Sequence, residues 1–378
     1  MPSYVQLTPG DPAPWFHQRS YANPRYAFDT AAGRYIVLCF FGSAGDAHAQ
    51  AAIGAVRSRP AFFDDATASF FGVSLDPRDE SEKRIADHYP GYRYFWDFDG
   101  TIGRLYGAVP RETEQPRVAV RRLWVVLDPT LRVLRAIPFA EDRADLAEVL
   151  ACLDGLPPPA RSAGLEVQAP ILVLPNVFEA EFCRTLIGLY EADGGRESGF
   201  MREVDGRTVA VHDHGHKRRR DYTIEDPAMI REAQTRFMRR VVPLIHRAYQ
   251  FKATRMERYI VSCYAAEDAA HFRAHRDNTT KGTAHRRFAV SVNLNEDFEG
   301  GEVSFPEFGA RSFRAPAGGA VVFSCSLLHA VSTVTRGRRY AFLPFLYDDD
   351  AARVREANAR FLSEERAGYR SGLAPAEA

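Results

Sequence analysis

Short apolar runs alternate with helical patterns over the first 155 residues. The apolar runs are rich in residues that favour strands, whereas the stretches between them are rich in Ala or in charged residues at helical spacing. The predicted strands lie at 34–42, 70–77 and 121–129, and the predicted helices at 48–59, 79–88 and 143–153. Strands that alternate with helices of this length predict an α/β layer with a partly parallel sheet.

A proline-rich stretch, LPPPARSAGLEVQAP at 156–170, separates this pattern from a different one and predicts a semi-rigid linker. Beyond it, two helical segments at 179–192 and 227–249 precede a series of short strands that starts at Met256. Gly and Pro punctuate these strands, which is typical of an antiparallel sandwich or barrel. We predict a first domain at 1–155, a linker at 156–170, and a β-barrel with helices on its outside at 171–350. A C-terminal helix (351–369) with a tail is predicted within 351–378.

Composition and charge narrow the classes of function. The chain of 378 residues carries 49 basic and 49 acidic side chains, which argues against a dedicated nucleic-acid binder. No apolar run approaches the roughly 18–20 residues that cross a bilayer, and the first residues lack the plan of a signal peptide. The five scattered cysteines are expected to be buried in a reducing compartment. We therefore expect a soluble, cytoplasmic protein that binds neither nucleic acid nor membrane; the oligomeric state is left open.

The segment HFRAHRDN indicates a possible metal site, because its His275 and Asp277 would project to the same face of an extended strand. His329 follows 52 residues after Asp277, and a second imidazole from another strand can complete one face of an octahedral metal site. Two neutral imidazoles and one carboxylate favour a divalent ion such as Fe(II) and leave three positions open. By itself an HxD pattern is more often an ordinary His–Asp hydrogen bond. Arg339, ten residues after His329, could hold a dicarboxylate whose other end chelates the metal.

On the basis of these residues, the stretch 255–347 resembles the prolyl-4-hydroxylase group of 2-oxoglutarate/Fe(II) oxygenases. Three further motifs occur in the family's order: SCY, NLNEDFEGGEVSFP and HAVSTVTRGRRYAF. The resemblance implies a double-stranded β-helix, a jelly-roll relative, with flanking helices. It also implies that iron is bound by His275, Asp277 and His329 and that Arg339 pairs with the distal carboxylate of 2-oxoglutarate. Tyr264 and Asn293 are the candidates for additional contacts with that cosubstrate.

The same resemblance implies a reaction. Fe(II), 2-oxoglutarate and O2 would be required, with ascorbate as a possible reductant, and succinate and CO2 would be released. Halogenating relatives carry a small residue in place of the carboxylate, so Asp277 favours hydroxylation. The substrate stays open between a prolyl or other side chain of a protein and a small molecule.

A second histidine-rich segment, VHDHGHKRRRDYTI at 211–224, allows three interpretations. It could be a second metal site formed by its alternating histidines, a solvated polar loop, or a loop that faces the substrate. The residues expected to contact substrate in the third case are His212, His214, Arg219 and Asp221. The basic stretch 217–221 could then bind an acidic or backbone-rich substrate.

The first half resembles the peroxiredoxin-like branch of the thioredoxin fold over 10–153, through DPAPWF, IVLCFFG, GVSLDP, FWDFDGTIGRLYGA and LWVVLDPTLRV. The loop that would carry the peroxidatic cysteine reads GSAGDAHAQ and contains no Cys; His48 lies near that place. Cys39 falls inside the preceding apolar strand. We therefore expect a non-catalytic scaffold or binding module. Two alternatives for the whole protein are a thiol-dependent peroxidase or reductase that uses Cys39, and a non-enzymatic protein that senses oxygen or 2-oxoglutarate.

Overall fold

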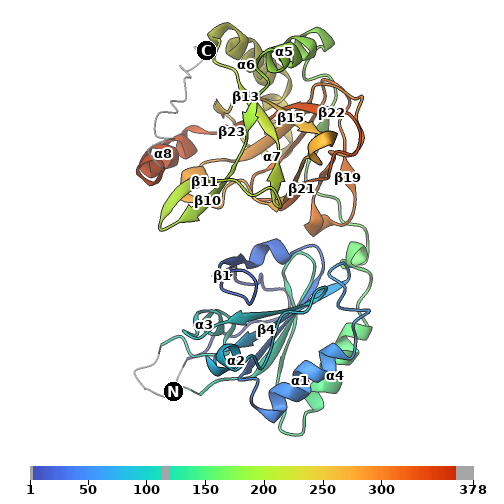
Figure 1. Cartoon of the computed structure of the whole chain (residues 1–378), viewed down its shortest axis with the longest axis vertical. Coiled ribbons are helices and arrows are strands. Elements are labelled where there is room, and N and C mark those ends of the chain that lie inside the picture. The colour runs from blue at the N-terminus through green and yellow to red at the C-terminus, as the bar shows by residue number, and fades with distance from the viewer. Residues whose placement is uncertain (1–2, 113–118, 363–378) are drawn as a thin grey trace. The chain divides into compact units, whose positions relative to one another are not determined.

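The computed structural model describes residues 3–112 and 119–362. The chain divides into two compact units (Figure 1). The first comprises Met1–Gln168 with Pro306–Ala310, and the second Ala169–Phe305 with Arg311–Ala378. The division along the chain therefore falls inside the segment predicted as a linker, which contains only a short 3-10 turn at Pro159–Arg161.

A mixed sheet forms the centre of the first unit, with the strand order β5-β4-β3-β6-β7. β4 is parallel to both β3 and β5, whereas β6 is antiparallel to β3 and to β7. The α/β class with a partly parallel sheet is confirmed. The strands are β3 (Tyr35–Gly42), β4 (Ala68–Ser74), β5 (Tyr92–Trp96), β6 (Leu123–Leu127) and β7 (Val133–Pro138), with a small ribbon of β1 (His17–Gln18) and β2 (Tyr26–Ala27).

The two faces of this sheet are covered by different helices (Figure 1). Alternate residues of β3 point to opposite faces. Val37 and Cys39 belong to the core that includes α1 and α4, whereas Phe40 packs on Tyr106 of α3 with ring centroids 5.4 Å apart. The helices are α1 (Ala47–Arg57), α2 (Arg78–Ser81), α3 (Thr101–Tyr106) and α4 (Ala144–Asp154).

One predicted helix of this unit is wrong. The segment 79–88 forms only the single turn α2, because Asp79 is turned inward and Lys83 adopts a left-handed conformation (φ 53°) that ends the helix. The carboxylate of Asp79 accepts hydrogen bonds from the Ala44 amide and the Ser74 hydroxyl, both at 2.7 Å. These bonds tie the turn to the ends of β3 and β4 rather than to a helix. Strands β5 and β7 were not predicted.

Two β-sheets make up most of the second unit. The large sheet has the order β14-β23-β17-β22-β15-β13-β9, with β20 beside β17 and β8 beside β20, and the small sheet has the order β12-β16-β21-β18-β19. The mainly β class is confirmed. The large-sheet strands are β8 (Leu172–Leu174), β9 (Arg196–Glu197), β13 (Arg220–Thr223), β14 (Arg255–Glu257), β15 (Ile260–Ala265), β17 (Phe288–Asn293), β20 (Ala320–Ser324), β22 (Arg338–Phe342) and β23 (Phe345–Tyr347). The small-sheet strands are β12 (Lys217–Arg218), β16 (His271–His275), β18 (Val303–Ser304), β19 (Ser312–Phe313) and β21 (His329–Val331), and β10 (Phe200–Val204) pairs with β11 (Arg207–Val211) as a hairpin.

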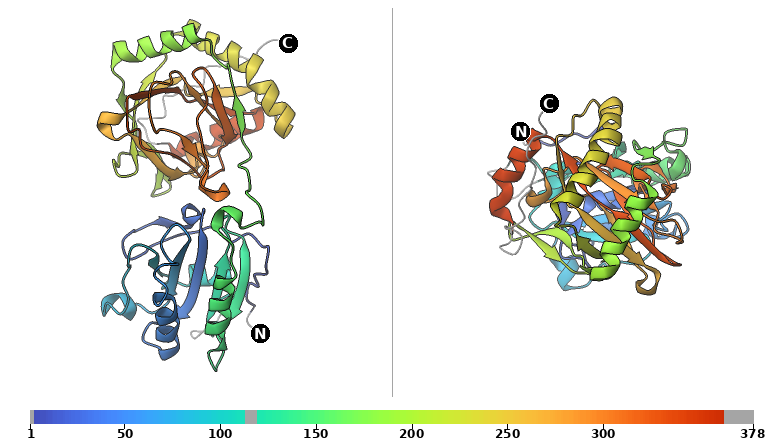
Figure 2. Two further views of the ribbon diagram at one scale, coloured as in Figure 1. Left: turned by 90° about the vertical axis from the view of Figure 1, so that its right-hand side faces the viewer. Right: turned by 90° about the horizontal axis from the view of Figure 1, so that it is seen from above.

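Helices lie on the outside of these strands, as predicted (Figure 2). They are α5 (Ala180–Asp193), α6 (Pro227–Arg240), α7 (Val242–Tyr249) and α8 (Asp349–Asn358). A single helix was predicted at 227–249, but the structure has two helices there, divided at Val241. Pro243 has no amide hydrogen to continue the helical bonding, so a new helix starts there. The predicted C-terminal helix ends at Asn358, and its last residues, 363–369, lie outside the described part of the chain.

Alternation along the strands of the large sheet separates a core face from a pocket face. Val261 and Cys263 of β15 join the hydrophobic core under the helices. Because side chains alternate, Ser262 and Tyr264 of the same strand face the interior between the two sheets. β17 and β22 repeat this pattern, so polar side chains of three adjacent strands collect inside the barrel.

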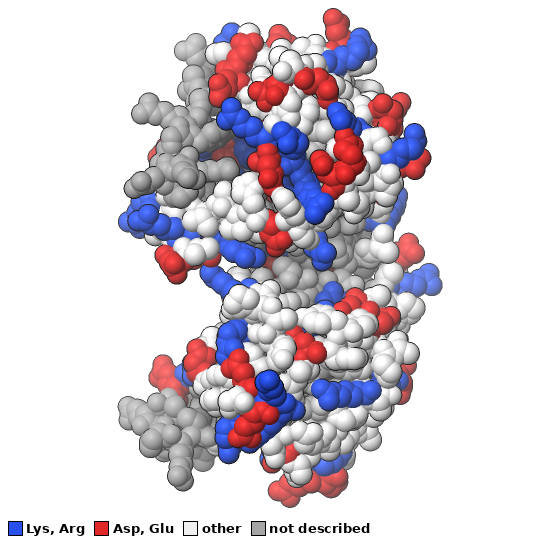
Figure 3. All heavy atoms as spheres, in the orientation of Figure 1, with Lys and Arg blue, Asp and Glu red and all other residues white. Residues whose placement is uncertain are grey.

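Basic and acidic side chains lie interspersed over the face of the surface drawn in Figure 3. No helix among the described residues is long and apolar enough to span a membrane. Four of the cysteines are buried and Cys152 is partly exposed.

Candidate metal centre

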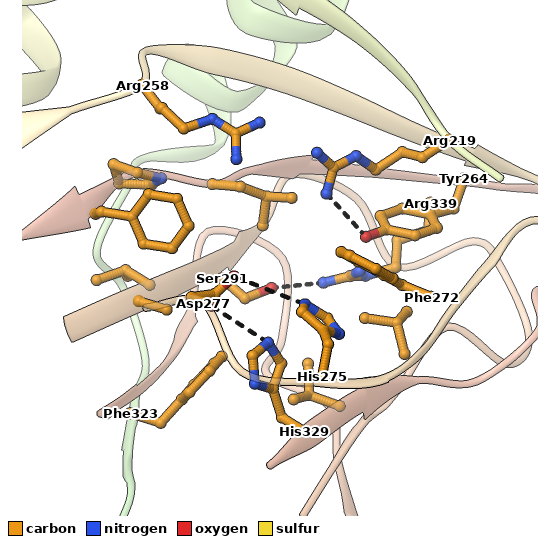
Figure 4. A pocket seen from close by; sticks show the side chains of 17 residues that line it. Arg219, Arg258, Tyr264, Phe272, His275, Asp277, Ser291, Phe323, His329 and Arg339 are labelled. Atoms are coloured by element: carbon orange, nitrogen blue, oxygen red, sulfur yellow. Dashed lines mark hydrogen bonds and ion pairs between the residues drawn. The ribbon is translucent and has the colours of Figure 1, made fainter. Parts of the chain in front are cut away.

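The side chains of His275, Asp277 and His329 converge at one end of the small sheet (Figure 4). Nε2 of His275 lies 3.6 Å from Oδ1 of Asp277, and Nε2 of His329 lies 3.4 Å from Oδ2. The three possible ligand atoms are within 4.8 Å of one another. Two imidazole nitrogens and one carboxylate oxygen at this spacing can share one metal ion.

Strand register brings the residues of this triad together. His275 pairs directly with His329 in the antiparallel ladder of β16 and β21, after a register shift that follows Phe272. Asp277 lies just beyond the end of β16, where its amide donates to the carbonyl of Cys325 at 3.0 Å. The sequence spacing alone could not give this register, because the shift changes which residues face each other.

Both imidazoles are held in the tautomer that a metal requires. Nδ1 of His275 is 2.8 Å from the carbonyl oxygen of Arg273, and Nδ1 of His329 is 3.0 Å from that of Leu327. A carbonyl oxygen can only accept, so each Nδ1 carries the proton and each Nε2 presents a lone pair towards Asp277.

Burial and packing favour the neutral form of His275. Burial, with His329 as the next contribution, lowers the pKa of His275 to about 4, so its ring is neutral at neutral pH. The ring of Phe272 stacks on it with a centroid distance of 3.5 Å. Burial of Asp277 raises the pKa of its carboxyl group, but the two neighbouring imidazoles, His329 first and then His275, outweigh this and hold that pKa below its usual range. These donors fit a divalent metal ion of borderline softness.

Arg339 is buried beside this triad, with an exposed fraction of 2%. Its Nε donates to Oδ1 of Asn293 at 2.9 Å and its Nη2 to the hydroxyl of Ser291 at 2.7 Å. Its Nη1 is buried and has no hydrogen-bond partner among the described residues. A guanidinium held in this way has a donor available for an anion in the pocket, and burial lowers its pKa to about 10.

The two other candidates for cosubstrate contacts have different positions. Tyr264 lines the same pocket and its hydroxyl accepts a hydrogen bond from Nη1 of Arg219 at 3.1 Å. Asn293 does not line the pocket, because its amide donates to the carbonyl of Ala315 at 2.7 Å while its oxygen accepts from Arg339. The structure therefore places Asn293 as a support for Arg339 rather than as a contact for a ligand.

The histidine-rich segment 211–224 is divided between the surface and the pocket. His212 and His214 are exposed and lie 3.5 and 2.6 Å from Glu197, whereas His216 turns inward against Phe200. Among the described residues these three histidines do not group as a metal site. Only the final part of the segment, with Arg219, reaches the pocket.

Arg219 and Asp221 form a buried ion pair. Nε of Arg219 lies 2.7 Å from Oδ1 of Asp221, and the hydroxyl of Ser262 donates to the same oxygen at 2.6 Å. Asp221 is therefore engaged within the protein, and Arg219 lines the cavity beside Tyr264. This part of the segment is in strands β12 and β13, so the interpretation as a solvated loop is wrong for it.

The cavity has about 510 Å³ of free space, the open mouth included. Its walls combine the triad and three arginines with an apolar side made of Ala289, Val290, Val303, Phe323, Val331, Leu343, Pro344 and Phe345. Arg258 is the charged lining residue that the sequence did not single out. It lies in the turn between β14 and β15, where no motif distinguishes it from the many other arginines of the chain.

In the first unit, the loop 42–50 contains no thiol. Asp46 caps α1 by accepting from the amides of His48 and Ala49, and the backbone oxygen of His48 accepts a hydrogen bond from Arg143. Cys39 is fully buried in β3, and burial raises its thiol pKa well above the usual value. A buried thiol of high pKa is a poor nucleophile, so the geometry does not favour a peroxidase that uses Cys39.

Comparison with known proteins assigns a class to each unit. Residues 257–347 match the family model described as the 2OG-Fe(II) oxygenase superfamily, and residues 9–135 match that of the AhpC/TSA family. The second unit thus contains a 2OG-Fe(II) oxygenase domain, and the first contains a peroxiredoxin-like domain of the thioredoxin fold. Both resemblances stated from the sequence are confirmed.

Individual relatives match parts of the chain. A PKHD-type hydroxylase of Pseudomonas fluorescens is 38% identical over 91 residues, which are 22% of this chain and 39% of that protein, so the chain spans about two fifths of its length. A prolyl hydroxylase of Trichoplax adhaerens, solved with a peptide of hypoxia inducible factor, is 17% identical with a TM-score of 0.39 and covers 50% of this chain and 87% of that one. Peroxidoxin BcpB of Mycobacterium tuberculosis is 21% identical with a TM-score of 0.34 and covers 40% of this chain and 99% of that one.

Proposed function

We propose that the second unit is an Fe(II)- and 2-oxoglutarate-dependent dioxygenase that hydroxylates its substrate and releases succinate and CO2. The observation that carries the proposal is the meeting of two oriented imidazoles and a carboxylate with a buried guanidinium that retains an unpartnered donor. The match to the oxygenase family model and the similarity to PKHD-type hydroxylases support it.

His275, Asp277 and His329 would hold the ferrous ion, which when bound supplies the activation of O2. The protein's own contribution is to keep the two Nε2 lone pairs and the carboxylate fixed before the ion arrives. The rings cannot turn away without losing the hydrogen bonds from Nδ1 to the carbonyls of Arg273 and Leu327.

Arg339 and Tyr264 would bind and orient 2-oxoglutarate. Nη1 of Arg339 can donate to the distal carboxylate, while Ser291 and Asn293 keep the guanidinium from rotating. The Tyr264 oxygen already accepts from Arg219, and no acceptor for its own proton is found among the described residues. That proton is therefore available to donate to a carboxylate oxygen of the cosubstrate.

An anaerobic titration tests the metal and the cosubstrate together. Addition of Fe(II) and then 2-oxoglutarate to the full chain under argon should give a metal-to-ligand charge-transfer absorbance, and admission of air should release succinate. Asp277→Ala should lower metal affinity and succinate release by about 100-fold or more, since even supporting residues of metal ligands contribute about 10–100-fold.

The matched control is Asp268→Ala, which removes an exposed carboxylate of the same unit. It should leave both readouts within about 2-fold, because an exposed substitution that breaks no buried contact has little effect. If the native chain gives no absorbance under argon, or if both variants behave alike, the assignment is wrong.

A further inference from the structure

Lys217 of β12 is buried, with an exposed fraction of 4%, although lysine side chains are rarely buried. Its amino group donates to the hydroxyl of Ser198 at 2.8 Å and to the carbonyl oxygen of Gly199 at 2.6 Å. Burial, with the charge of Arg219 as the next contribution, lowers the pKa of Lys217 well below its usual value. An amino group donates hydrogen bonds in both of its protonation states, so these two contacts do not depend on its charge.

One series of contacts, the metal branch, leads from Lys217 to the imidazole of His275. Lys217 and Phe272 are direct partners in the antiparallel pairing of β12 with β16, and Nζ lies over the Phe272 ring, 5.0 Å from its centroid. That ring stacks on the His275 imidazole, with centroids 3.5 Å apart and an angle of 19° between the two planes (Figure 4). Direct cross-strand partners pack on each other, so Lys217 helps to hold the ring that limits the tilt of His275.

A second series, the cosubstrate branch, leads from Lys217 to Tyr264. Ser198 accepts from Lys217, and its own hydroxyl donates to Oδ2 of Asp221 at 2.5 Å. Nη2 of Arg219 donates to the same oxygen at 2.7 Å, and its Nη1 donates to the Tyr264 hydroxyl at 3.1 Å (Figure 4). Groups bonded in series fix one another's orientation, so the phenolic proton of Tyr264 is directed away from Arg219.

Other residues also hold the carboxylate in the cosubstrate branch. The hydroxyl of Ser262 donates to Oδ1 of Asp221 at 2.6 Å, and Nη2 of Arg258 is 3.4 Å from its Oδ2. Loss of the contact from Lys217 should therefore loosen the branch without breaking it. A moderate change in ligand affinity is expected rather than a complete loss.

We propose that Lys217 is a positioning residue that holds a metal ligand and a cosubstrate ligand in place at the same time. It acts on His275 through the metal branch and on Tyr264 through the cosubstrate branch. This deepens the proposed function and rests on it. Lys217 is not among the residues that line the pocket, so its effect on iron and on 2-oxoglutarate passes through these two side chains.

Two titrations of the full chain under argon measure the two branches separately. The affinity for Fe(II) alone, measured by competition with a chromophoric chelator, reports on the metal branch. The half-saturating concentration of 2-oxoglutarate at saturating Fe(II), measured by the charge-transfer absorbance, reports on the cosubstrate branch.

Lys217→Met keeps a long unbranched side chain but removes the donors. It should lower the Fe(II) affinity and raise the half-saturating concentration of 2-oxoglutarate, each by about 3–30-fold, as for residues that act on a site through others. The wavelength of the absorbance at saturation should stay at its native value, because the same atoms hold the ion. Lys252→Met, at an exposed lysine of the same unit, is the control and should change both values by less than about 2-fold.

Double variants separate positioning from a general loss of stability. Tyr264→Phe removes the hydroxyl at the end of the cosubstrate branch, and Phe272→Leu removes the ring of the metal branch. Added to Tyr264→Phe, Lys217→Met should change the 2-oxoglutarate value by less than about 2-fold but still weaken Fe(II) binding. Added to Phe272→Leu, it should do the reverse. Tyr264→Phe loses only a hydroxyl, so the test does not depend on the folding of the leucine variant.

The outcomes distinguish this role from the proposed function. If the native chain gives the absorbance but Lys217→Met behaves like Lys252→Met, or changes only one of the two values, the positioning role is overturned and the dioxygenase assignment stands. Effects of Lys217→Met that add in full to those of Tyr264→Phe also overturn it. If the native chain gives no absorbance, it is the dioxygenase assignment that fails.

Discussion

The two imidazoles of the metal centre are fixed by the same local device. In each case Nδ1 bonds to the carbonyl oxygen two residues earlier in the chain, at Arg273 for His275 and at Leu327 for His329. Because this hydrogen bond is local, each imidazole is oriented by its own segment of the chain. The pairing of β16 with β21 then brings the two oriented imidazoles together with Asp277.

Charged residues of the first unit contribute to stability in a way that pH can reveal. Burial of Asp65 raises its pKa, but hydrogen bonds from Arg93 and Ser69 outweigh this and lower the pKa from 3.8 to about 2. Arg93 bonds both carboxylate oxygens, at 2.6 and 2.7 Å. A carboxyl group whose folded pKa is depressed stabilises the fold above its unfolded pKa, and this contribution is lost as the pH falls through the folded value.

We therefore predict that Asp65→Asn lowers the free energy of unfolding of the first unit by about 2 kcal/mol at pH 7. The difference from the native chain should shrink between about pH 4 and pH 2, where the native carboxylate takes up its proton. Urea unfolding followed by tryptophan fluorescence measures this. Asp142→Asn, at an exposed carboxylate, is the control, and a difference that is independent of pH would contradict the prediction.

At the scale of elements, the sequence predicted strands best where they bury apolar side chains. The strands β3, β4, β6, β15, β17, β20 and β22 were found because they contain apolar or alternating runs. In the small sheet, the runs EVSF and HAVSTV predicted β18 and β21, and HFRAH of β16 was taken as an extended strand, whereas β12 and β19 were missed. β12 and β19 have two residues each, and β12 reads KR, so neither contains an apolar period.

The candidate site shows the same limit. His275, Asp277, His329 and Arg339 could be proposed from spacing and resemblance, and the structure brings them to one cavity. The support of Arg339 by Ser291 depends on the pairing of β17 with β22, which no single motif encodes. Arg258 was missed for a similar reason, since its place in the pocket lining depends on a turn in which it adopts a left-handed conformation with φ 65°.

The segment that follows β17 sets the position of Arg339. Gly301 has φ 69°, and a Cβ atom there would lie 2.8 Å from Cδ of Arg339 and 2.9 Å from Cγ2 of Val334. We predict that Gly301→Ala raises the half-saturating concentration of 2-oxoglutarate by about 10-fold or more, since a displacement of about 1 Å at a positioning group can cost about 100-fold. Titration of the charge-transfer absorbance measures this.

Gly206→Ala is the matched control for this substitution. Gly206 has a similar φ of 75°, and a Cβ atom added there would meet no other atom of the described residues within 4 Å. Both alanines therefore bear a comparable backbone cost of about 1–2 kcal/mol, and only the change at 301 meets Arg339. Equal 2-oxoglutarate affinities in the two variants would mean that Arg339 does not depend on this contact.

At the scale of the whole molecule, each unit has its own hydrophobic core. The pocket lies entirely in the second unit, whereas Trp15, Trp96 and Trp124, which are all of the chain's tryptophans, lie in the first. Tryptophan fluorescence therefore reports the unfolding of the first unit, and circular dichroism reports both. This distribution allows the response of each unit to a ligand to be measured in the intact chain.

A ligand that binds only the folded second unit should stabilise that unit alone. At about 100 times the dissociation constant, Fe(II) with 2-oxoglutarate under argon should add about 2.7 kcal/mol, which corresponds to a rise of about 5–10 °C in Tm for a unit of this size. We predict this rise in the transition seen by circular dichroism and a change of less than about 1 °C in the tryptophan transition, because every residue that lines the pocket belongs to the second unit. A tryptophan transition that moves by the same amount would show that the two cores unfold together. The control is the Asp277→Ala chain with the same additives. Neither of its transitions should move, which separates binding from nonspecific effects of the additives.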